Sequence, residues 1–542
     1  MPGSKNAVER KLAEVESLWL DASDNDDARF FIWRTAADSD RLIQVFFALQ
    51  QEGQNDYTTP DLFVHFTTPF ETAYGYSHAL EQEFIERVNI SSFPEPHWSS
   101  DGLTPCYRGD VLFSLLNDFA RHHQDCFRYL AVLLTPAAIS HSGSFHGFLD
   151  ELCRASAAVP SYLRFILVDT NENPAWQGLA DRFPETVRVL TPEISEDELM
   201  RQTLNETPTT DGTAMLRFRQ VMVDSFISLK KGPAVQTEKF AQKALALARQ
   251  NGWWDQQVVV FSMIAGGWLK EKNTQNAIKN YRLAVQHAER LPDESRHTLT
   301  VQCLMGEGNA WFMEKDYRQA SDTFHRSAVA AQNMPSLLLE MESHRMAGFS
   351  LMAASPAPEE TAQHYHAALL TGLSMSEEER ATSGFMQIFR DLLNHLSPDA
   401  AARCTRFAEQ YVAEQAELVR QAELAVSQAA SPDIAAVVPE NDRELEQKTE
   451  ALFQRTLLQR EQMLIQESSL YRQLLCLARY HSHVFWTPGT EIAHPLNKPS
   501  GEWPFAPLLA VPEIPPTKED TQAMFGLIFP PLQESQNVGV EA

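Results

Sequence analysis

Residues 268–284 read WLKEKNTQNAIKNYRLA, and residues 311–327 read WFMEKDYRQASDTFHRS. The two stretches begin 43 residues apart and share a tryptophan, an alanine nine positions later and an aromatic residue four positions further on. These residues are Trp268, Ala277 and Tyr281 in the first stretch, and Trp311, Ala320 and Phe324 in the second. A pattern that recurs at one period is the sequence signature of a repeat protein, whose units bury their apolar faces on one another.

Small residues extend this pattern, because Ala265 and Gly308 each stand three residues before the tryptophan of their stretch. Weaker copies centre on Ala241 and Ala362. The small residues would let two helices approach closely, and the aromatic residues would fill the space between successive helix pairs. The pattern resembles the tetratricopeptide repeat, and this resemblance predicts TPR-like helical repeats over residues 212–428. The period of 36–43 residues is longer than the roughly 34 of that family, so an irregular helical bundle is the alternative.

A different pattern occupies residues 25–205, where short apolar runs alternate with stretches of helical periodicity. The runs are RFFIWR (29–34), LFVHF (62–66), FRYLAVLL (127–134), LRFILV (163–168) and VRVL (187–190). Continuous apolar strands that alternate with helices are typical of a parallel sheet covered on both faces. We therefore predict an α/β domain over residues 25–205, preceded by a helix within residues 1–24.

The order of these elements resembles the P-loop ATPase core of the AAA+ and STAND families, with Arg29 to Arg34 as the strand that leads into the phosphate loop. A phosphate loop needs glycines and a lysine, so that backbone N–H groups and a cation reach the phosphates. Residues 35–40 read TAADSD instead, with two acids and no glycine, and no lysine occurs between Lys11 and Lys230. The resemblance therefore implies a degenerate copy, and we expect no nucleotide or other cofactor.

The C-terminal part reads as a loop at residues 431–440, a long helix within 442–486 and a Pro-rich extended tail over 487–542. The helix carries a broken heptad of leucines, which favours packing on the chain's own repeats over an intermolecular coiled coil. The tail includes Trp503, Phe505 and Phe525. Such large apolar residues are uncommon in disordered segments, so we expect the tail to lie along a groove of this chain or of a partner.

Composition limits the possible partners. The formal net charge is −27, whereas phosphate backbones and anionic membranes require clustered Lys and Arg. No apolar run is long enough for a membrane span, and the N-terminus lacks the apolar core of a signal peptide. The six cysteines lie far apart, which is typical of reduced, mostly buried thiols. We expect a soluble cytoplasmic protein that binds neither nucleic acid nor membrane.

Candidate catalytic and metal-binding residues are few. His122, His123, Asp125 and Cys126 lie together, but adjacent histidines on a helix point apart and a structural zinc site needs four convergent ligands. Ser144 lies in GSFHG (143–147), which differs from a nucleophile elbow because the serine is not central. We interpret both clusters as structural, and we assign no catalytic, cofactor-binding or metal-binding residue.

These observations predict a non-catalytic protein-interaction scaffold, an adaptor or chaperone-like accessory protein. An inactive α/β domain before helical repeats resembles bacterial regulators and secretion-associated accessory proteins. The groove of stacked helix pairs would bind a basic or amphipathic protein, because the chain is acidic. Lys270 and Glu307, expected to be exposed on the first helices of two pairs, are the candidate contact residues. The alternatives are a STAND-type signalling regulator and an enzyme with an unrecognised site in the α/β domain.

Overall fold

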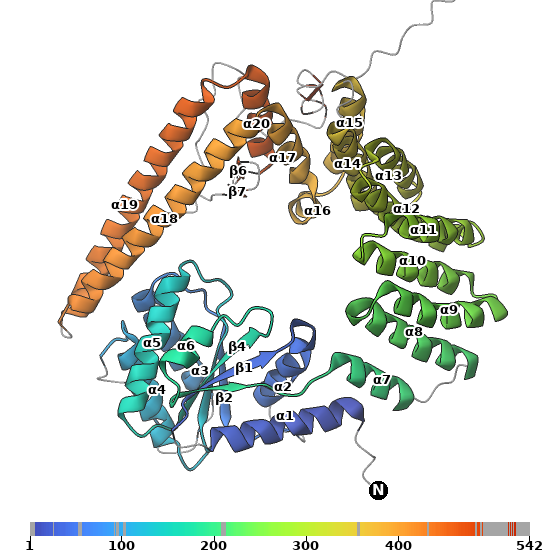
Figure 1. Cartoon of the computed structure of the whole chain (residues 1–542). Coiled ribbons are helices and arrows are strands. Elements are labelled where there is room, and N and C mark those ends of the chain that lie inside the picture. The colour runs from blue at the N-terminus through green and yellow to red at the C-terminus, as the bar shows by residue number, and fades with distance from the viewer. Residues whose placement is uncertain are drawn as a thin grey trace, which may run out of the picture. The chain divides into compact units, whose positions relative to one another are not determined.

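The computed structural model divides the chain into two compact units (Figure 1). One unit comprises Met1–Pro208 with Ala413–Thr449, and the other comprises Thr209–Val412 with Glu450–Ala542. The residues that the structure describes are 6–24, 27–52, 57–91, 93, 97–100, 104–206, 213–354, 358–430, 433–482, 485–487, 490–491, 519, 521, 523, 525 and 526.

The first unit is built on a five-stranded sheet in the order β2-β3-β4-β1-β5, and every pair of neighbouring strands is parallel. The strands are β1 (Phe30–Thr35), β2 (Leu62–Phe66), β3 (Leu130–Leu134), β4 (Leu163–Thr170) and β5 (Val187–Leu190). Each strand coincides with one of the predicted apolar runs, although β1 extends one residue and β4 two residues beyond its run. The predicted parallel sheet is confirmed. Because Arg34 of β1 stands opposite Asp169 of β4, polar side chains of two strands meet at the carboxyl edge.

Helices cover both faces of this sheet, which is why its strands are apolar on both sides. Phe30 and Ile32 face one core, Phe31 and Trp33 face the other, and all four are fully buried. Residues of α3 (Ala73–Ile90), α4 (Gly109–His122) and α5 (Ser142–Ala158) complete the first core, and residues of α1 (Ala7–Ser23) and α2 (Asp40–Glu52) complete the second. The unit also contains η1 (Ala37–Ser39), α6 (Gln177–Arg182) and α7 (Glu196–Glu206). Helix α1 therefore packs on the sheet through Trp19, whose Nε1 atom donates to Asp61 at 2.7 Å.

Two long helices, α18 (Pro398–Gln428) and α19 (Ile434–Leu464), contribute residues 413–449 to this unit. Tyr74 of α3 packs against Val426, Ile434 and Val438, and its hydroxyl donates to Asp442 at 2.7 Å. The division of the chain therefore does not coincide with the predicted boundary at residue 428. The predicted loop over 431–440 is also too long, because α19 begins at Ile434 and continues through a proline at its sixth position.

The second unit begins with four helix pairs within the described residues of 213–373, as Figure 1 shows. The pairs are α8 (Thr213–Lys231) with α9 (Ala234–Gln250), α10 (Trp254–Lys270) with α11 (Thr274–Ala288), α12 (Asp293–Met313) with α13 (Tyr317–Ala331), and α14 (Leu337–Ala353) with α15 (Pro358–Leu373). Each helix packs on the next one in the chain. The predicted class, an α/β domain followed by a run of packed helices with a long C-terminal helix, is confirmed.

A final core closes the second unit. It contains residues of α14, α15, α17 (Phe385–Leu396) and α20 (Ser469–His481), the last of which is separated from α19 by a break after Leu464. The remaining elements are α16 (Glu377–Thr382) and an antiparallel pair, β6 (Phe485–Thr487) with β7 (Thr490–Glu491). From the predicted tail, Phe525 is fully buried in this core and its ring contacts that of His366. Trp503 and Phe505 lie outside the described residues.

Candidate functional site

The repeat residues predicted from the sequence lie at the junctions between helices. Ala277 and Ala320 have no exposed surface, and Tyr281 and Phe324 are buried beside them. Each ring lies against a glycine of α12: a Cβ atom added to Gly308 would lie 2.6 Å from Phe324. In the same way, a Cβ atom added to Gly306 would overlap the ring of Tyr281. These two glycines therefore leave room for the aromatic rings.

The turn inside each of two helix pairs repeats the same geometry. Lys272 and Lys315, which are 43 positions apart, have φ values of 60° and 65°, a left-handed conformation that non-glycine residues seldom adopt. The residue that follows each lysine caps the second helix: Asn273 accepts from the backbone of α11, and Asp316 accepts from that of α13. This agreement in backbone geometry defines the repeat independently of the tryptophans.

The glutamate before each of these lysines reaches back to the preceding pair. Glu271 accepts a hydrogen bond from the backbone N–H of Ala234, the first residue of α9, at 2.7 Å. Glu314 accepts one from the hydroxyl of Thr274, the first residue of α11. A carboxylate at a helix N-terminus satisfies unpaired N–H groups and the helix dipole. A glutamate therefore joins the second pair to the first and the third pair to the second.

The two tryptophans lie at equivalent places, and each is half-buried rather than fully buried. The indole Nε1 atom of Trp268 donates to Glu238 at 3.0 Å, and that of Trp311 donates to Glu307 at 3.3 Å. An exposed ring edge with a hydrogen-bonded N–H is a common arrangement for tryptophan.

Both candidate partner-contact residues make contacts within the chain. Lys270 is exposed, and its ammonium group donates to the backbone carbonyls of Leu229 and Lys230 at 2.9 and 2.8 Å. These carbonyls end helix α8, where a cation is favourable. The expectation that Glu307 is exposed is wrong. Glu307 is only 1% exposed, because this face of α12 packs on α11. Arg282 of α11 donates a hydrogen bond to the Glu307 carboxylate at 2.8 Å.

Other positions of α12 are exposed instead. Gln302 and Asn309 lie two helical turns apart on this first helix of its pair, and both are exposed. The positions 43 residues earlier in α10, Val259 and Gly266, are half-buried. Positions seven residues apart on the first helices α10 and α12 are therefore half-buried in one helix and exposed in the other.

At the carboxyl edge of the sheet, Arg34 and Asp169 form a two-point ion pair between β1 and β4. The Arg34 Nε and Nη2 atoms donate to the two carboxylate oxygens at 2.7 and 2.8 Å, and its Nη1 atom donates to Gln177 at 2.6 Å. The hydrogen bond to Asp169 raises the pKa of Arg34 despite its burial. The backbone N–H of Trp176 also donates to Asp169 at 3.1 Å. The cation of Arg34 is thus already paired with a carboxylate of the chain.

The turn after β1 holds a carboxylate of the chain itself. The backbone N–H of Ala37, the first residue of η1, donates to Glu172 at 2.9 Å. Glu172 lies in the segment after β4, and Asp38 and Asp40 add further negative charge to the same turn. Backbone N–H groups at a helix start commonly bind phosphate. Here a carboxylate of the chain itself accepts from that N–H group.

A cavity of about 570 Å³ lies beside this turn, between α1, the end of β1 and the segment that follows β5. Its charged lining residues are Arg10, Lys11, Glu14, Arg34, Glu193 and Glu198. The Lys11 ammonium group donates to Glu14 at 2.5 Å, and Arg10 donates to Gln202 at 3.4 Å. The cavity occupies the edge where open α/β sheets bind ligands, but its cations are paired with side chains of the chain.

The minor clusters singled out in the sequence have structural surroundings. His123 is buried, and its ring packs on those of Phe93 and Phe119. Within the described part of the chain, the residues around His122 do not converge as metal ligands. Ser144 lies in the first turn of α5. The six cysteines are free, and five of them are buried, as expected from their spacing.

A group that the sequence analysis missed lies within the repeats. His325 of α13, His344 of α14 and His364 of α15 have ring nitrogen atoms within 4.8 Å of one another. They are 19 and 20 residues apart, which is close to the length of one helix with its turn. Two of them adjoin repeat aromatics, since His325 follows Phe324 and His364 precedes Tyr365. Reading the repeat register residue by residue would have placed them on adjacent helices.

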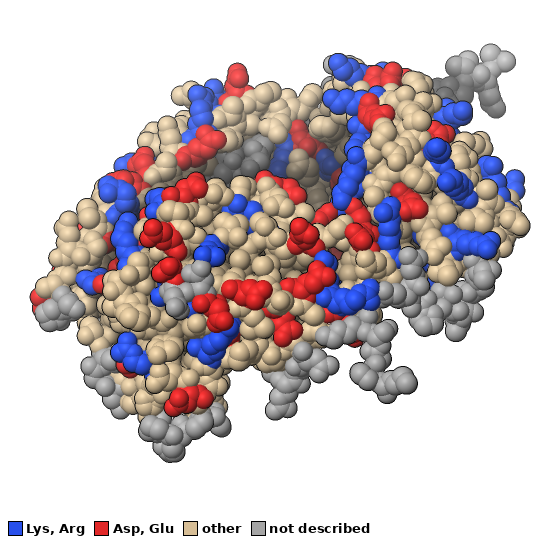
Figure 2. All heavy atoms as spheres, turned by 60° about the horizontal axis from the view of Figure 1, so that its bottom comes forward, with Lys and Arg blue, Asp and Glu red and all other residues tan. Residues whose placement is uncertain are grey.

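Neither a protein-family model, nor a curated protein, nor a solved structure was found to match this chain. Among the described helices, none combines the length and apolar character that a membrane crossing requires. On the face of the molecule drawn in Figure 2, acidic and basic side chains are interspersed. The fold and its side-chain contacts are therefore the basis on which a function is proposed.

Proposed function

We propose that this chain is a non-catalytic protein-interaction scaffold, an adaptor or chaperone-like accessory protein that binds a protein through its TPR-like helix pairs. The observation that carries the proposal is the repeated junction geometry: equivalent left-handed lysines, equivalent capping residues and equivalent glutamates that reach back to the preceding pair. Stacks of equivalent helix pairs form extended surfaces that repeat proteins use for binding.

The proposed contact surface is the stripe of the first helices that includes Gln302 and Asn309. We propose these two residues as contact residues in place of Glu307 and Lys270. Glu307 is paired with Arg282, and the ammonium group of Lys270 donates to a carbonyl at the end of α8. The formal net charge of −27 favours a basic or amphipathic partner, because charge complementarity accelerates association and excludes acidic competitors.

Two carboxylates at the carboxyl edge of the sheet in the α/β unit support the proposal. Glu172 takes the N–H of Ala37, and Asp169 pairs with Arg34, so a triphosphate would have to displace one carboxylate and approach others. Isothermal titration of the full chain with Mg-ATP and Mg-GTP is expected to give no heat of binding. A micromolar dissociation constant would favour the STAND-type alternative instead.

The cavity beside this turn favours a second candidate, a small-ligand or catalytic site in the α/β unit. It has the volume of a small-molecule site, and such sites usually contain a few converging polar groups. The proposed scaffold function does not require it. A small molecule that binds there and is turned over would establish the enzyme alternative.

The scaffold proposal is tested by co-purification of the tagged full chain from its native host, followed by mass spectrometry. The double variant Gln302→Arg/Asn309→Arg places two cations on the proposed surface and should lose a basic partner. The matched control is Gln275→Arg/Gln286→Arg, which changes two exposed residues of α11, a second helix. Equal recovery of one partner with both double variants would exclude the proposed surface.

A further inference from the structure

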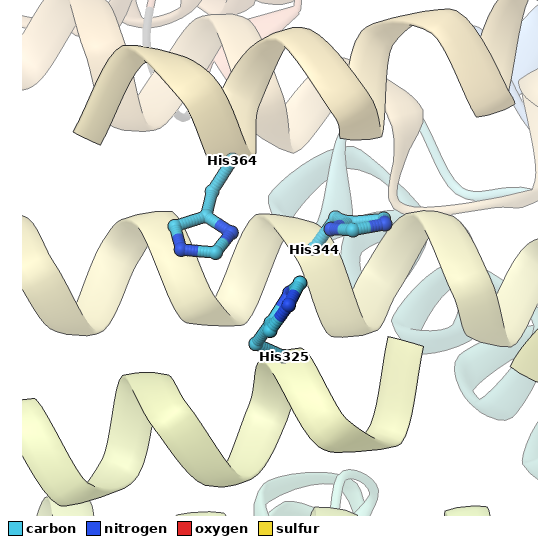
Figure 3. A group of neighbouring side chains, drawn as sticks. All are labelled: His325, His344 and His364. Atoms are coloured by element: carbon cyan, nitrogen blue, oxygen red, sulfur yellow. The ribbon is translucent and has the colours of Figure 1, made fainter. Parts of the chain in front are cut away.

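Three histidines from three consecutive helices of the repeats converge at one point (Figure 3). His325, His344 and His364 come from α13, α14 and α15, and their rings point toward one another. The ring centroids of His325 lie 6.0 Å from those of His344 and 5.3 Å from those of His364, and the third distance is 6.2 Å. Each ring can offer a nitrogen atom within 4.8 Å of the other two.

The helices that carry these rings are held together beside them. The hydroxyl groups of Ser327 on α13 and Ser343 on α14 are hydrogen-bonded at 3.0 Å and are both fully buried. On the other side, Gly348 of α14 lets α15 approach closely, since an added Cβ atom would lie 3.4 Å from the Cβ atom of His364. Rigid elements that already hold their ligands near one point are what a metal site requires.

The burial of His344, on the middle helix α14, is not balanced at its Nδ1 atom by a hydrogen bond from any residue that the structure describes. The residue His344 is 6% exposed, and its Nδ1 atom is buried without a hydrogen-bond partner among the described residues. A buried polar atom without a partner is unfavourable. Burial and the neighbouring rings of His364 and His325 lower the pKa of His344 to about 4. A neutral imidazole is the form that binds metals.

We propose that His325, His344 and His364 form a binding site for a divalent transition-metal ion, with Zn²⁺ as the ion that the site fits best. Imidazole nitrogens suit zinc, copper and nickel, whereas Mg²⁺ and Ca²⁺ prefer oxygen ligands. Three histidines around Zn²⁺ leave a fourth position for water or an added ligand. This inference goes beyond the proposed scaffold function and does not depend on it.

The geometry requires a small adjustment on binding. Ligand nitrogens around tetrahedral Zn²⁺ lie about 3.3 Å apart, from Zn–N bonds of roughly 2.0–2.1 Å, so the rings must approach by about 1.5 Å. His325 is exposed and can provide most of this movement by rotating its side chain. Asp322, one turn earlier on α13, acts electrostatically on His364 and supplies negative charge beside the site. The bound ion would link the last two helix pairs.

The test uses the full chain, freed of any histidine tag, treated with EDTA and dialysed into metal-free buffer. Titration with Zn²⁺ against a chromophoric chelator is expected to give one ion per chain, and excess Mg²⁺ should not displace it. His325→Ala removes an exposed ligand without opening the core. It should weaken binding by more than the roughly 10–100-fold that loss of an outer-shell partner causes. His395→Ala, which removes an exposed histidine of α17 in the same unit, should bind as the wild type does.

Thermal unfolding gives a second readout. Zn²⁺ should raise the transition temperature of the wild type and of His395→Ala, but not that of His325→Ala, because a ligand stabilises only the state that binds it. Circular dichroism of the metal-free proteins checks that both variants are folded, and His364→Asn replaces His325→Ala if that variant is not. Failure of the wild type to bind Zn²⁺, or equal affinity in His325→Ala and His395→Ala, would overturn the proposal.

Discussion

Replacing Gly308 with alanine is expected to destabilise the helical unit, although alanine is the better helix former. In a helix interior, alanine is favoured over glycine by roughly 0.5–1 kcal/mol. The added Cβ atom would lie 2.6 Å from Cε1 and 2.7 Å from Cζ of Phe324, which is fully buried. Carbon atoms normally approach to about 3.5–4.0 Å, so the ring or the helix must move by about 1 Å. Overpacking of this kind costs roughly 1–3 kcal/mol, and we expect a net loss of about 1–2 kcal/mol.

Gly266→Ala is the matched control for this prediction. Gly266 lies within α10, and no heavy atom outside its immediate neighbours lies within 4 Å of the added Cβ atom. That variant should gain roughly 0.5–1 kcal/mol, so the two variants should differ by about 1.5–3 kcal/mol. Urea unfolding followed by circular dichroism measures this difference, and hydrogen–deuterium exchange should show faster exchange in α12 and α13 for Gly308→Ala alone. A Gly308→Ala protein as stable as the wild type would refute the small-residue account of the repeats.

The remaining predictions concern equivalent positions, the sheet edge and one buried histidine. Trp268→Ala and Trp311→Ala should each lower the free energy of unfolding of the helical unit by about 3 kcal/mol, the lower part of the range for aromatic truncation because both rings are half-buried; clearly unequal losses in urea melts would contradict the repeat register. Asp169→Asn should destabilise the α/β unit by about 3 kcal/mol, because Arg34 loses its buried carboxylate; unchanged exchange in β1 and β4 would count against this. Burial lowers the pKa of His481 from 6.5 to about 4, so the stability that its neutral form supports is complete above pH 6.5 and is lost as the pH falls toward 4. The loss should reach roughly 2–3 kcal/mol, and His481→Gln should unfold with a flatter pH dependence over this range.

The local sequence pattern was sufficient to predict those features of the fold that depend on residues close together in the chain. The continuous apolar runs predicted strands buried on both faces, and each of the five strands overlaps one of those runs. The spacing of Ala277, Tyr281, Ala320 and Phe324 predicted helices joined by small and aromatic residues, and these residues are buried at the junctions.

Charged side chains were harder to place from the sequence. A glutamate in a helix is usually exposed, and Glu307 was assigned accordingly. Its burial depends on Arg282, a residue of the preceding helix whose guanidinium group neutralises it. Likewise, nothing in residues 413–449 alone indicates that they pack on the α/β unit. That contact depends on Tyr74, which packs on these helices, and on Glu423, 349 positions later in the sequence. The Glu423 carboxylate accepts a hydrogen bond from the backbone N–H of Ala73, the residue before Tyr74.

The sequence by itself determined the elements and their kind, because periodicity and composition report which face of each helix or strand is buried. It also indicated a run of similar helix pairs, because equivalent residues recur at a spacing of 36–43 residues. Only the tertiary structure decided which side chains from different helices meet. His325, His344 and His364 are separated by 19 and 20 residues, and each is an ordinary helical residue in its own segment. Their convergence depends on the stacking angle and spacing of α13, α14 and α15, which result from packing across helices and leave no local pattern in the chain.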